Sequence, residues 1–197
     1  LYKHIENIKN VYKLPCVVAI NRFPTDTEDE LKLVEEKCKE YGVDVSLCEV
    51  WGKGSDGGLD LAEKVLDLAK QDNDFTYAYS DDLSLEEKIN AVATKIYGAD
   101  GVEFTPAAKK ELAKLTELGF SSYPVCMAKT QYSLSDNQKL LGRPTGFKIT
   151  VKKVKVSAGA GFVVCQTGDI MTMPGLPKVP SAEKIDVDEN GVITGLF

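Results

Sequence analysis

The sequence predicts an α/β protein in which a parallel-sheet βαβα segment is followed by a smaller α+β region. Apolar runs over residues 14–20 and 43–50 have the length of buried strands, and a segment with apolar residues at helical spacing follows each run. Short links between such elements favour parallel strands with right-handed crossovers. We expect residues 1–75 to complete a sheet begun upstream, and residues 76–197 to form the α+β region.

Local signals define the elements of the first part. The run 14–20 is continuously apolar, as in a strand that is buried on both faces. Thr27 and Glu30 have the spacing of a capping box at the start of a helix, and Gly42 is placed to end that helix. The remaining elements expected here are a glycine-rich loop over 51–58 and a helix over 59–71.

The second part alternates helices with short strands. Ser84 and Glu87 predict a second capping box, and Thr105 followed by Pro106 predicts a further helix start. The expected elements are a polar surface loop over 72–83, helices over 85–97 and 107–118, strands over 102–104, 123–128, 147–156 and 162–166, a loop-rich stretch over 129–146, a proline-containing loop over 173–181 and a hairpin around 189–191.

The net negative charge makes nucleic acid and anionic membranes poor candidates for partners of this chain. The chain has 197 residues, and Lys+Arg minus Asp+Glu is 24 − 30 = −6. An acidic chain whose only arginines are Arg22 and Arg143 is a poor candidate for binding nucleic acid or an anionic membrane. No apolar run approaches the ~20 residues of a membrane span, and the sequence opens with neither an initiator Met nor a signal peptide. We expect a cytoplasmic protein, of which this chain is a part.

Cysteine and histidine usage excludes several kinds of catalytic site. The number of cysteines is odd and no CxxC spacing occurs, which indicates a reducing compartment. The cysteines in apolar stretches, which we expect to be buried free thiols, are Cys16, Cys48, Cys126 and Cys165. The only histidine, His4, lies near a chain start that we expect to fray, so Ser-His-Asp triads, Cys–His dyads and His-based metal sites are not expected.

Two segments that follow predicted strands carry candidate binding groups. The carboxyl ends of parallel strands meet at one sheet edge, so we expect 21–27 and 51–58 to lie together. Phe23 and Trp51 could hold a planar heterocycle between their rings, or could cover the sheet edge as part of the core. The glycines, which suit either close approach to an anion or flat ligand or a tight turn, are Gly52, Gly54, Gly57 and Gly58. They complete no nucleotide-binding fingerprint.

A third candidate follows the strand predicted over 123–128. The stretch KTQYS over 129–133 collects polar groups beyond the end of that strand. Such a stretch suits a phosphate or carboxylate site, or a loop held together by its own hydrogen bonds. The acidic side chains of the chain mostly fall on predicted helix surfaces or in linkers, so no catalytic acid–base pair is predicted.

Longer motifs carry a family resemblance. They are VVAINRFPTDT over 17–27, EVWGKG with the following GG over 49–58, CMAKTQYS over 126–133 and MTMPGLP over 171–177. Together they resemble the formate–tetrahydrofolate ligase family, also called 10-formyltetrahydrofolate synthetase, and the closing stretch 185–197 is similar to that family's C-terminus. The family's Walker A loop does not occur in this sequence. The chain is therefore similar to the C-terminal portion of such an enzyme.

The resemblance implies a reaction and a set of partners. The intact enzyme is expected to be an ATP-dependent, C–N bond-forming ligase of one-carbon metabolism. It joins formate to tetrahydrofolate through formyl phosphate and gives 10-formyltetrahydrofolate, ADP and phosphate. The implied ligands are formate, tetrahydrofolate and ATP with Mg²⁺. The implied partners are the missing N-terminal region of the same enzyme and further copies in a homo-oligomer.

The resemblance also implies roles for individual residues. Positions that match Phe23 and Trp51 stack on either side of the pterin, and positions that match Pro24 and Leu47 line the same pocket. The segment with Gly52, Gly54, Gly57 and Gly58 is expected to lie beside that pocket, near the nucleotide. No residue is assigned to catalysis or to metal binding, and the fragment alone is expected to be inactive.

Two other functions stay open at this point. One is a non-catalytic binding or interaction module that keeps the fold without the chemistry. The other is a free-standing NAD or nucleotide domain, against which the absent phosphate-loop fingerprints weigh. The observation that would separate these is the response of Trp51, the only tryptophan, to a folate.

Overall fold

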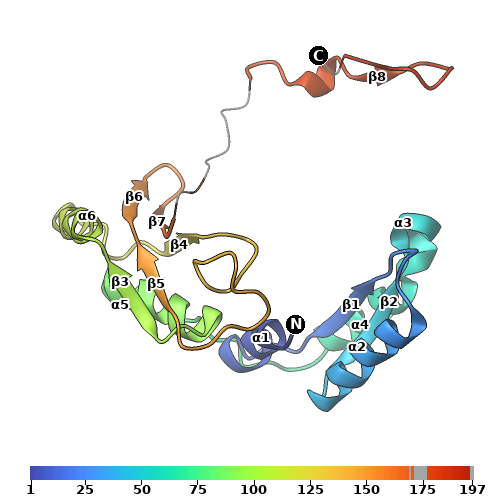
Figure 1. The fold of residues 1–197 in the computed structure, drawn as a ribbon, viewed down its shortest axis with the longest axis horizontal. Coiled ribbons are helices and arrows are strands. Elements are labelled where there is room, and N and C mark those ends of the chain that lie inside the picture. Colours follow the sequence, from blue (N-terminus) through green and yellow to red (C-terminus); the bar gives the residue numbers. More distant parts are fainter. Residues whose placement is uncertain (169, 171–176, 196–197) are drawn as a thin grey trace.

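A computed structural model describes residues 1–168, 170 and 177–195 (Figure 1). Its first elements are α1 (Tyr2–Glu6), the π-helical turn η1 (Asn7–Val11), β1 (Val17–Asn21), α2 (Glu28–Glu40), β2 (Asp44–Cys48), α3 (Val50–Lys53), the 3₁₀ helix η2 (Gly54–Gly58) and α4 (Leu59–Ala69). The later elements are α5 (Leu85–Ala91), the π-helical turn η3 (Val92–Tyr97), β3 (Gly101–Phe104), α6 (Pro106–Glu117), β4 (Val125–Ala128), β5 (Lys148–Val151), β6 (Lys153–Ser157), β7 (Phe162–Gln166), the 3₁₀ helix η4 (Ser181–Glu183), β8 (Asp186–Val187) and β9 (Ile193–Thr194).

The predicted α/β class is confirmed by the strand pairing. β1 and β2 are parallel, in a register that runs from Val17 opposite Asp44 to Asn21 opposite Cys48. Helix α2 connects them and α4 follows, which is the expected βαβα order, and Figure 1 shows these elements together in blue and cyan. The capping box at the start of α2 is present, because the Thr27 side chain accepts from the Glu30 N–H while Glu30 accepts from the Thr27 N–H.

The burial expected for β1 is wrong. The sequence predicted a strand buried on both faces, but every residue of β1 is half-buried or exposed. The physical reason is that, among the described residues, β1 pairs only with β2, so its other edge has no neighbour. Helix α4 likewise has no buried residue, and Val65 of its apolar face is 49% exposed. The βαβα unit therefore keeps uncovered the apolar surface typical of the inside of a larger sheet.

The second part contains two small sheets around the main core. β3 and β5 form a parallel pair, while β7 lies between a parallel β4 and an antiparallel β6. The single strand predicted over 147–156 is wrong, because the chain changes partners at Lys152. Its backbone N–H donates to the Gln166 carbonyl at 2.8 Å, and its own carbonyl accepts from the Thr105 hydroxyl at 3.0 Å.

The main core lies where α5 and α6 pack against these strands. Its buried members include Leu85 and Ile89 of α5, Leu112 of α6 and Val163 of β7. The capping box predicted for α5 is present at Ser84, and Pro106 occupies the first turn of α6 as expected. The second region thus has the continuous apolar interior that the βαβα unit lacks.

The start of the chain is helical, contrary to the expected fraying. Ile5 of α1 is 3% exposed and packs into a small core with Cys38 and Val43. Asn7 donates from Nδ2 to the Ile96 carbonyl at 2.9 Å, so the same helical segment also contacts the second region. Figure 1 shows α1 between the two groups of elements. The division at residue 75 stays a prediction.

The C-terminal hairpin is confirmed, since β8 and β9 pair in antiparallel fashion around a turn in which Gly191 has φ +76°. Residues 171–176, which hold nearly all of the motif over 171–177 and the first part of the proline-containing loop over 173–181, lie outside the described residues.

The cysteines are free but differ in burial. Cys48 and Cys165 are buried as predicted, whereas Cys16 is only half-buried. Cys126 is exposed, so the prediction for it is wrong. It belongs to β4, an outer strand of its sheet, which leaves one side of the residue open to solvent.

Candidate functional site

The two segments predicted to share a sheet edge leave that edge side by side. The last paired residues of the parallel strands are Asn21 and Cys48, and the Arg22 N–H extends the ladder by donating to the Cys48 carbonyl at 3.1 Å. The segment after β1 and the α3–η2 segment after β2 therefore start from adjacent points. This is the edge at which open α/β sheets bind ligands.

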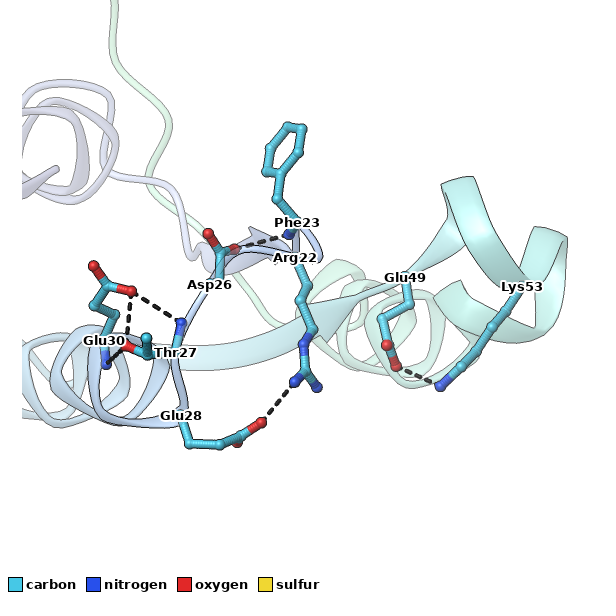
Figure 2. A network of polar contacts seen from close by, with 8 residues as sticks. All are labelled: Arg22, Phe23, Asp26, Thr27, Glu28, Glu30, Glu49 and Lys53. Carbon is cyan, nitrogen blue, oxygen red and sulfur yellow. Dashed lines mark hydrogen bonds and ion pairs between the residues drawn. The ribbon is translucent and has the colours of Figure 1, made fainter.

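Each segment presents a large aromatic ring to solvent. The Phe23 ring is 57% exposed, and Figure 2 shows it pointing away from the polar contacts around it. Trp51 in α3 is 62% exposed, and its Nε1–H donates to the Arg22 carbonyl at 2.6 Å. That bond ties the indole to the residue beside Phe23. The ring pairs seen among the described residues do not include Phe23 with Trp51, so the two rings are not packed on each other.

Pro24 and Leu47 stand close to these rings in the chain. Pro24 follows Phe23 directly and is exposed. Leu47 is half-buried in β2, in register with Ile20 of β1, one step before the end of the ladder. The structure thus gathers Phe23, Pro24, Leu47 and Trp51 around one end of two paired strands, although a pterin pocket formed by these four residues stays a prediction.

The glycine-rich segment is helical, so the loop predicted over 51–58 is wrong. It forms α3 and then η2, because the Gly52 and Lys53 N–H groups both donate to the Glu49 carbonyl and start a helical turn. A Cβ on Gly57 would lie 2.5 Å from the carbonyl carbon of Glu49, and one on Gly58 would lie 2.9 Å from Val50 Cγ1. Real Cβ atoms do not approach other atoms so closely, so Gly57 permits a backbone contact that a side chain would block.

Gly52 and Gly54 differ from this pair. A Cβ built on either one would meet no atom within 4 Å. Gly54 adopts φ +61°, a conformation that glycine takes readily, whereas Gly52 lies in α3. The tight-turn alternative therefore accounts for Gly57, while the placement of a nucleotide beside Gly52 and Gly54 stays a prediction.

Ion pairs occupy the two basic side chains at this edge. Arg22 contacts Glu28 at 2.6 Å and Lys53 contacts Glu49 at 2.5 Å, as drawn in Figure 2. The hydrogen bond from Lys53 lowers the pKa of the Glu49 carboxyl. The two basic side chains named here are both paired with glutamates. Neither is left to attract an anion, so this edge suits an uncharged planar group better.

Two hydrogen bonds to the backbone hold the Phe23 and Trp51 segments at this edge, and neither bond was predicted from the sequence. The Asp26 carboxylate accepts from the Phe23 N–H at 2.8 Å and closes a turn that presents the ring. The Asp three residues after Phe23 is the signal that could have indicated this turn. The bond from Trp51 to the Arg22 carbonyl spans 29 residues, and no local pattern predicts it.

The stretch over 129–133 behaves as a loop held by its own hydrogen bonds. Lys129 Nζ donates to the carbonyls of Thr130, Ser133 and Ser135, and it lies 5.0 Å from the centroid of the Tyr97 ring. Burial lowers the pKa of this ammonium group. The lysine is thus occupied in shaping the loop, which favours that alternative over a phosphate site centred on Lys129.

Over residues 1–168, 170 and 177–195, no group of three or more His, Cys, Asp or Glu side chains is placed to hold a metal ion. None of the helices in the described part of the chain is long and apolar enough to cross a membrane.

The chain was compared with models of known protein families. The model of the family described as formate–tetrahydrofolate ligase matches residues 1–197 of this chain.

Proposed function

Because the chain belongs to the formate–tetrahydrofolate ligase family, we propose that it supplies the wall of the active site that holds the pterin of tetrahydrofolate. The observation that carries the proposal is the pair of exposed rings, Phe23 and Trp51, at the carboxyl end of one parallel strand pair. A hydrogen bond fixes each aromatic residue: the Phe23 N–H donates to the Asp26 carboxylate, and the indole N–H of Trp51 donates to the Arg22 carbonyl.

The proposed wall works by orientation. A flat bicyclic ring between two aromatic faces gains about 0.5–1.5 kcal/mol per aromatic pair beyond the burial of its area. Pro24 and Leu47 add apolar contacts beside the rings without introducing charge. Held in this way, N10 of the folate meets the activated formyl carbon without the entropy cost of a free encounter. No side chain of this wall is given the role of nucleophile or proton carrier.

The nucleotide is placed beside the wall. We propose that Gly52 and Gly54, which face open space, lie on the ATP side of the site, and that Gly57 and Gly58 hold the segment against Glu49 and Val50. Mg²⁺ is proposed to enter with ATP and to be held outside this wall. Phosphate chemistry then belongs to residues of the enzyme outside this chain.

The uncovered surface of the βαβα unit indicates where the rest of the enzyme joins. We propose that residues 1–75 complete a sheet of the intact enzyme through the open edge of β1, and that residues 76–197 form a separate α+β region. The exposed face of α4, which includes Val65, is covered in the same assembly. The intact enzyme is proposed to be a cytoplasmic homo-oligomer that binds its small-molecule substrates and neither nucleic acid nor a membrane.

The test uses a matched pair of exposed phenylalanines. Phe23→Ala removes a ring from the proposed wall, whereas Phe75→Ala removes another exposed ring, which lies in the segment 72–83 and contacts Tyr12 and Tyr77. Tetrahydrofolate should quench the emission of Trp51, and Phe23→Ala should weaken that binding at least about tenfold, which corresponds to about 1.4 kcal/mol. Phe75→Ala should leave the affinity unchanged. Equal affinities for all three proteins, or an emission unaffected by tetrahydrofolate, would contradict the proposal.

A second test concerns chemistry in the isolated chain. We propose that this chain alone does not form formyl phosphate, since no Walker A loop occurs in its sequence. Incubation with formate, ATP, Mg²⁺ and tetrahydrofolate should therefore release no ADP above the rate seen without protein. Release of ADP that depends on formate would overturn this part of the proposal and leave the pterin wall untouched.

A further inference from the structure

An open strand edge in the region 76–197 has a groove beside it. Strand β3 pairs in parallel with β5, and in the described part of the chain it pairs with no other strand. Figure 1 shows β3 and β5 side by side, and α5 contacts β3. Each strand of a parallel pair directs only alternate backbone groups to its neighbour. The remaining N–H and C=O groups of β3 therefore face the open edge, where a further strand can pair with them.

The groove, of about 530 Å³, lies between β3 and the helical segment formed by α5 and η3. On the strand side it is lined by Val102 and Phe104, which are two residues apart and so share one face of β3. Both are half-buried and pack against the main core. Asn90 of α5 and Thr94 of η3 line the opposite side. A groove between a helix and an open strand edge suits an extended peptide, which adds a strand through its backbone and places alternate side chains in the groove.

The lining of the groove carries a net negative charge. Glu86 and Glu87 lie on the α5 side, and Lys95 of η3 is the basic residue of the lining. Glu87 accepts from the Ser84 N–H at 2.9 Å and from the Ser84 hydroxyl at 2.7 Å, two bonds that hold the carboxylate without neutralising it. The Lys95 ammonium donates to the Ala78 carbonyl at 2.7 Å. With two carboxylates against one ammonium, the groove favours a positively charged partner.

The same charges argue against a second copy of this chain as the occupant. Two copies that paired through β3 about a two-fold axis would bring Glu86 and Glu87 of both copies to one interface. Like charges placed together across an interface are costly. The occupant that fits is therefore a segment with a basic side chain.

We propose that the open edge of β3 binds an extended segment of a partner protein that carries apolar and basic side chains on the same face. The backbone of the segment pairs with β3, its apolar side chains contact Val102 and Phe104, and its basic side chain contacts Glu86 and Glu87. The residues of this surface lie outside the β1–β2 unit, so it is independent of the pterin wall.

The probe is the peptide KTVTVT with blocked ends, titrated into the purified protein and followed by calorimetry. Its lysine and valines share one face of an extended strand, and its threonines share the other. The peptide ETVTVT differs only in the charge of its first residue and should bind at least about fivefold more weakly. Equal affinities of the two peptides, or no heat with KTVTVT at millimolar concentration, would overturn the proposal.

Methylation of the peptide nitrogens tests whether the peptide binds as a strand. In one version the lysine and the valines carry the methyl groups, and in the other version the threonines carry them. Because only alternate N–H groups of an added strand face β3, one version should lose binding and the other should keep it. Loss of binding by both versions, or retention by both, would contradict pairing through the backbone.

Hydrogen exchange locates the contact. The peptide should slow amide exchange in β3, and protection confined to other segments would place the peptide elsewhere and refute the proposed edge. Protection of β3 that appears without peptide as the protein concentration rises would show that a second copy is the occupant, which also refutes the proposal.

Two glutamate variants test the acidic side of the groove. Glu86→Gln should weaken the binding of KTVTVT about two- to fivefold. Glu117→Gln makes the same change at an exposed position of α6 that does not line the groove, and it should leave the affinity unchanged. Equal effects of the two variants would show that the peptide lysine does not contact Glu86, contrary to the proposal.

Discussion

Gly57→Ala is the substitution that should disturb the aromatic wall without touching either ring. The new Cβ would stand 2.5 Å from the carbonyl carbon and 2.6 Å from the carbonyl oxygen of Glu49. Carbon atoms in favourable contact are about 3.5–4.0 Å apart, so the two backbone segments must separate by about 1 Å. Because Glu49 immediately precedes α3, this separation moves the helical turn that carries Trp51.

The expected magnitude follows from that displacement. Forcing extra atoms into a packed contact costs about 1–3 kcal/mol, which corresponds to a fall in Tm of about 2–12 °C for a chain of this size. A group displaced by about 1 Å from its working position can lose up to about 100-fold in a positioned reaction or contact. We therefore expect a lower Tm, a changed emission of Trp51 and tetrahydrofolate binding weakened by about 10- to 100-fold.

Gly52→Ala is the matched control for this substitution. It adds the same methyl group to the same glycine-rich segment, but its Cβ meets no atom within 4 Å. Alanine is also favoured over glycine in a helix by about 0.5–1 kcal/mol, so the control should be as stable as the parent or slightly more stable. The assay is the emission maximum of Trp51 and its quenching by acrylamide, followed by titration with tetrahydrofolate. If Gly57→Ala and Gly52→Ala give the same emission and Tm, the reasoning from the Glu49 contact is refuted.

Other predictions concern stability and thiol chemistry. Thr27→Ala removes the capping box of α2 and should cost about 0.5–2 kcal/mol, measured as a lower urea midpoint. The Arg143 guanidinium holds the pKa of the Glu6 carboxyl below its ordinary value of 4.5, so this contribution to stability is present above about pH 4.5 and is lost as the pH falls through the lowered pKa. Arg143→Gln should therefore reduce the difference in unfolding free energy between about pH 6 and pH 3, and an unchanged difference would contradict the assignment. Cys126, which is exposed, should react with a thiol reagent in the native protein, whereas burial raises the pKa of Cys165 to about 12 and should protect it until the protein unfolds.

Features set by neighbouring residues were predictable from the sequence. The capping boxes at Thr27 and Ser84 depend on a side chain and a backbone group three residues apart, and both form as predicted. The parallel pairing of β1 with β2 followed from the strand–helix–strand order, which leaves few topologies. The common edge for Phe23 and Trp51 then followed from the pairing, because residues beyond the carboxyl ends of adjacent parallel strands start from neighbouring points.

Other features were not predictable in this way. The glycines over 51–58 indicated a loop, but the Glu49 carbonyl gathers two N–H groups and turns the segment into short helices. The run over 147–156 alternates like one strand, but its first part pairs with β3 and its second part with β7, which are far away in the chain. Burial of β1 was inferred from its composition, yet burial depends on which elements lie against a strand.

The two exposed rings of the proposed wall and the main buried core lie in different parts of this chain. The buried cluster that joins α5, α6 and β7 has Leu85, Ile89 and Val163 at or near zero exposure, whereas the unit that carries Phe23 and Trp51 has a small core around Cys38. A unit with few buried apolar contacts opens locally at lower free energy than the core of the same chain. Covering the open edge of β1 and the exposed face of α4 would therefore stabilise the very elements that position the two rings. On this reasoning, the affinity of the proposed wall for a pterin should rise when the open edge of β1 is covered, because any ordering that a ligand must impose on the free unit subtracts from its binding energy.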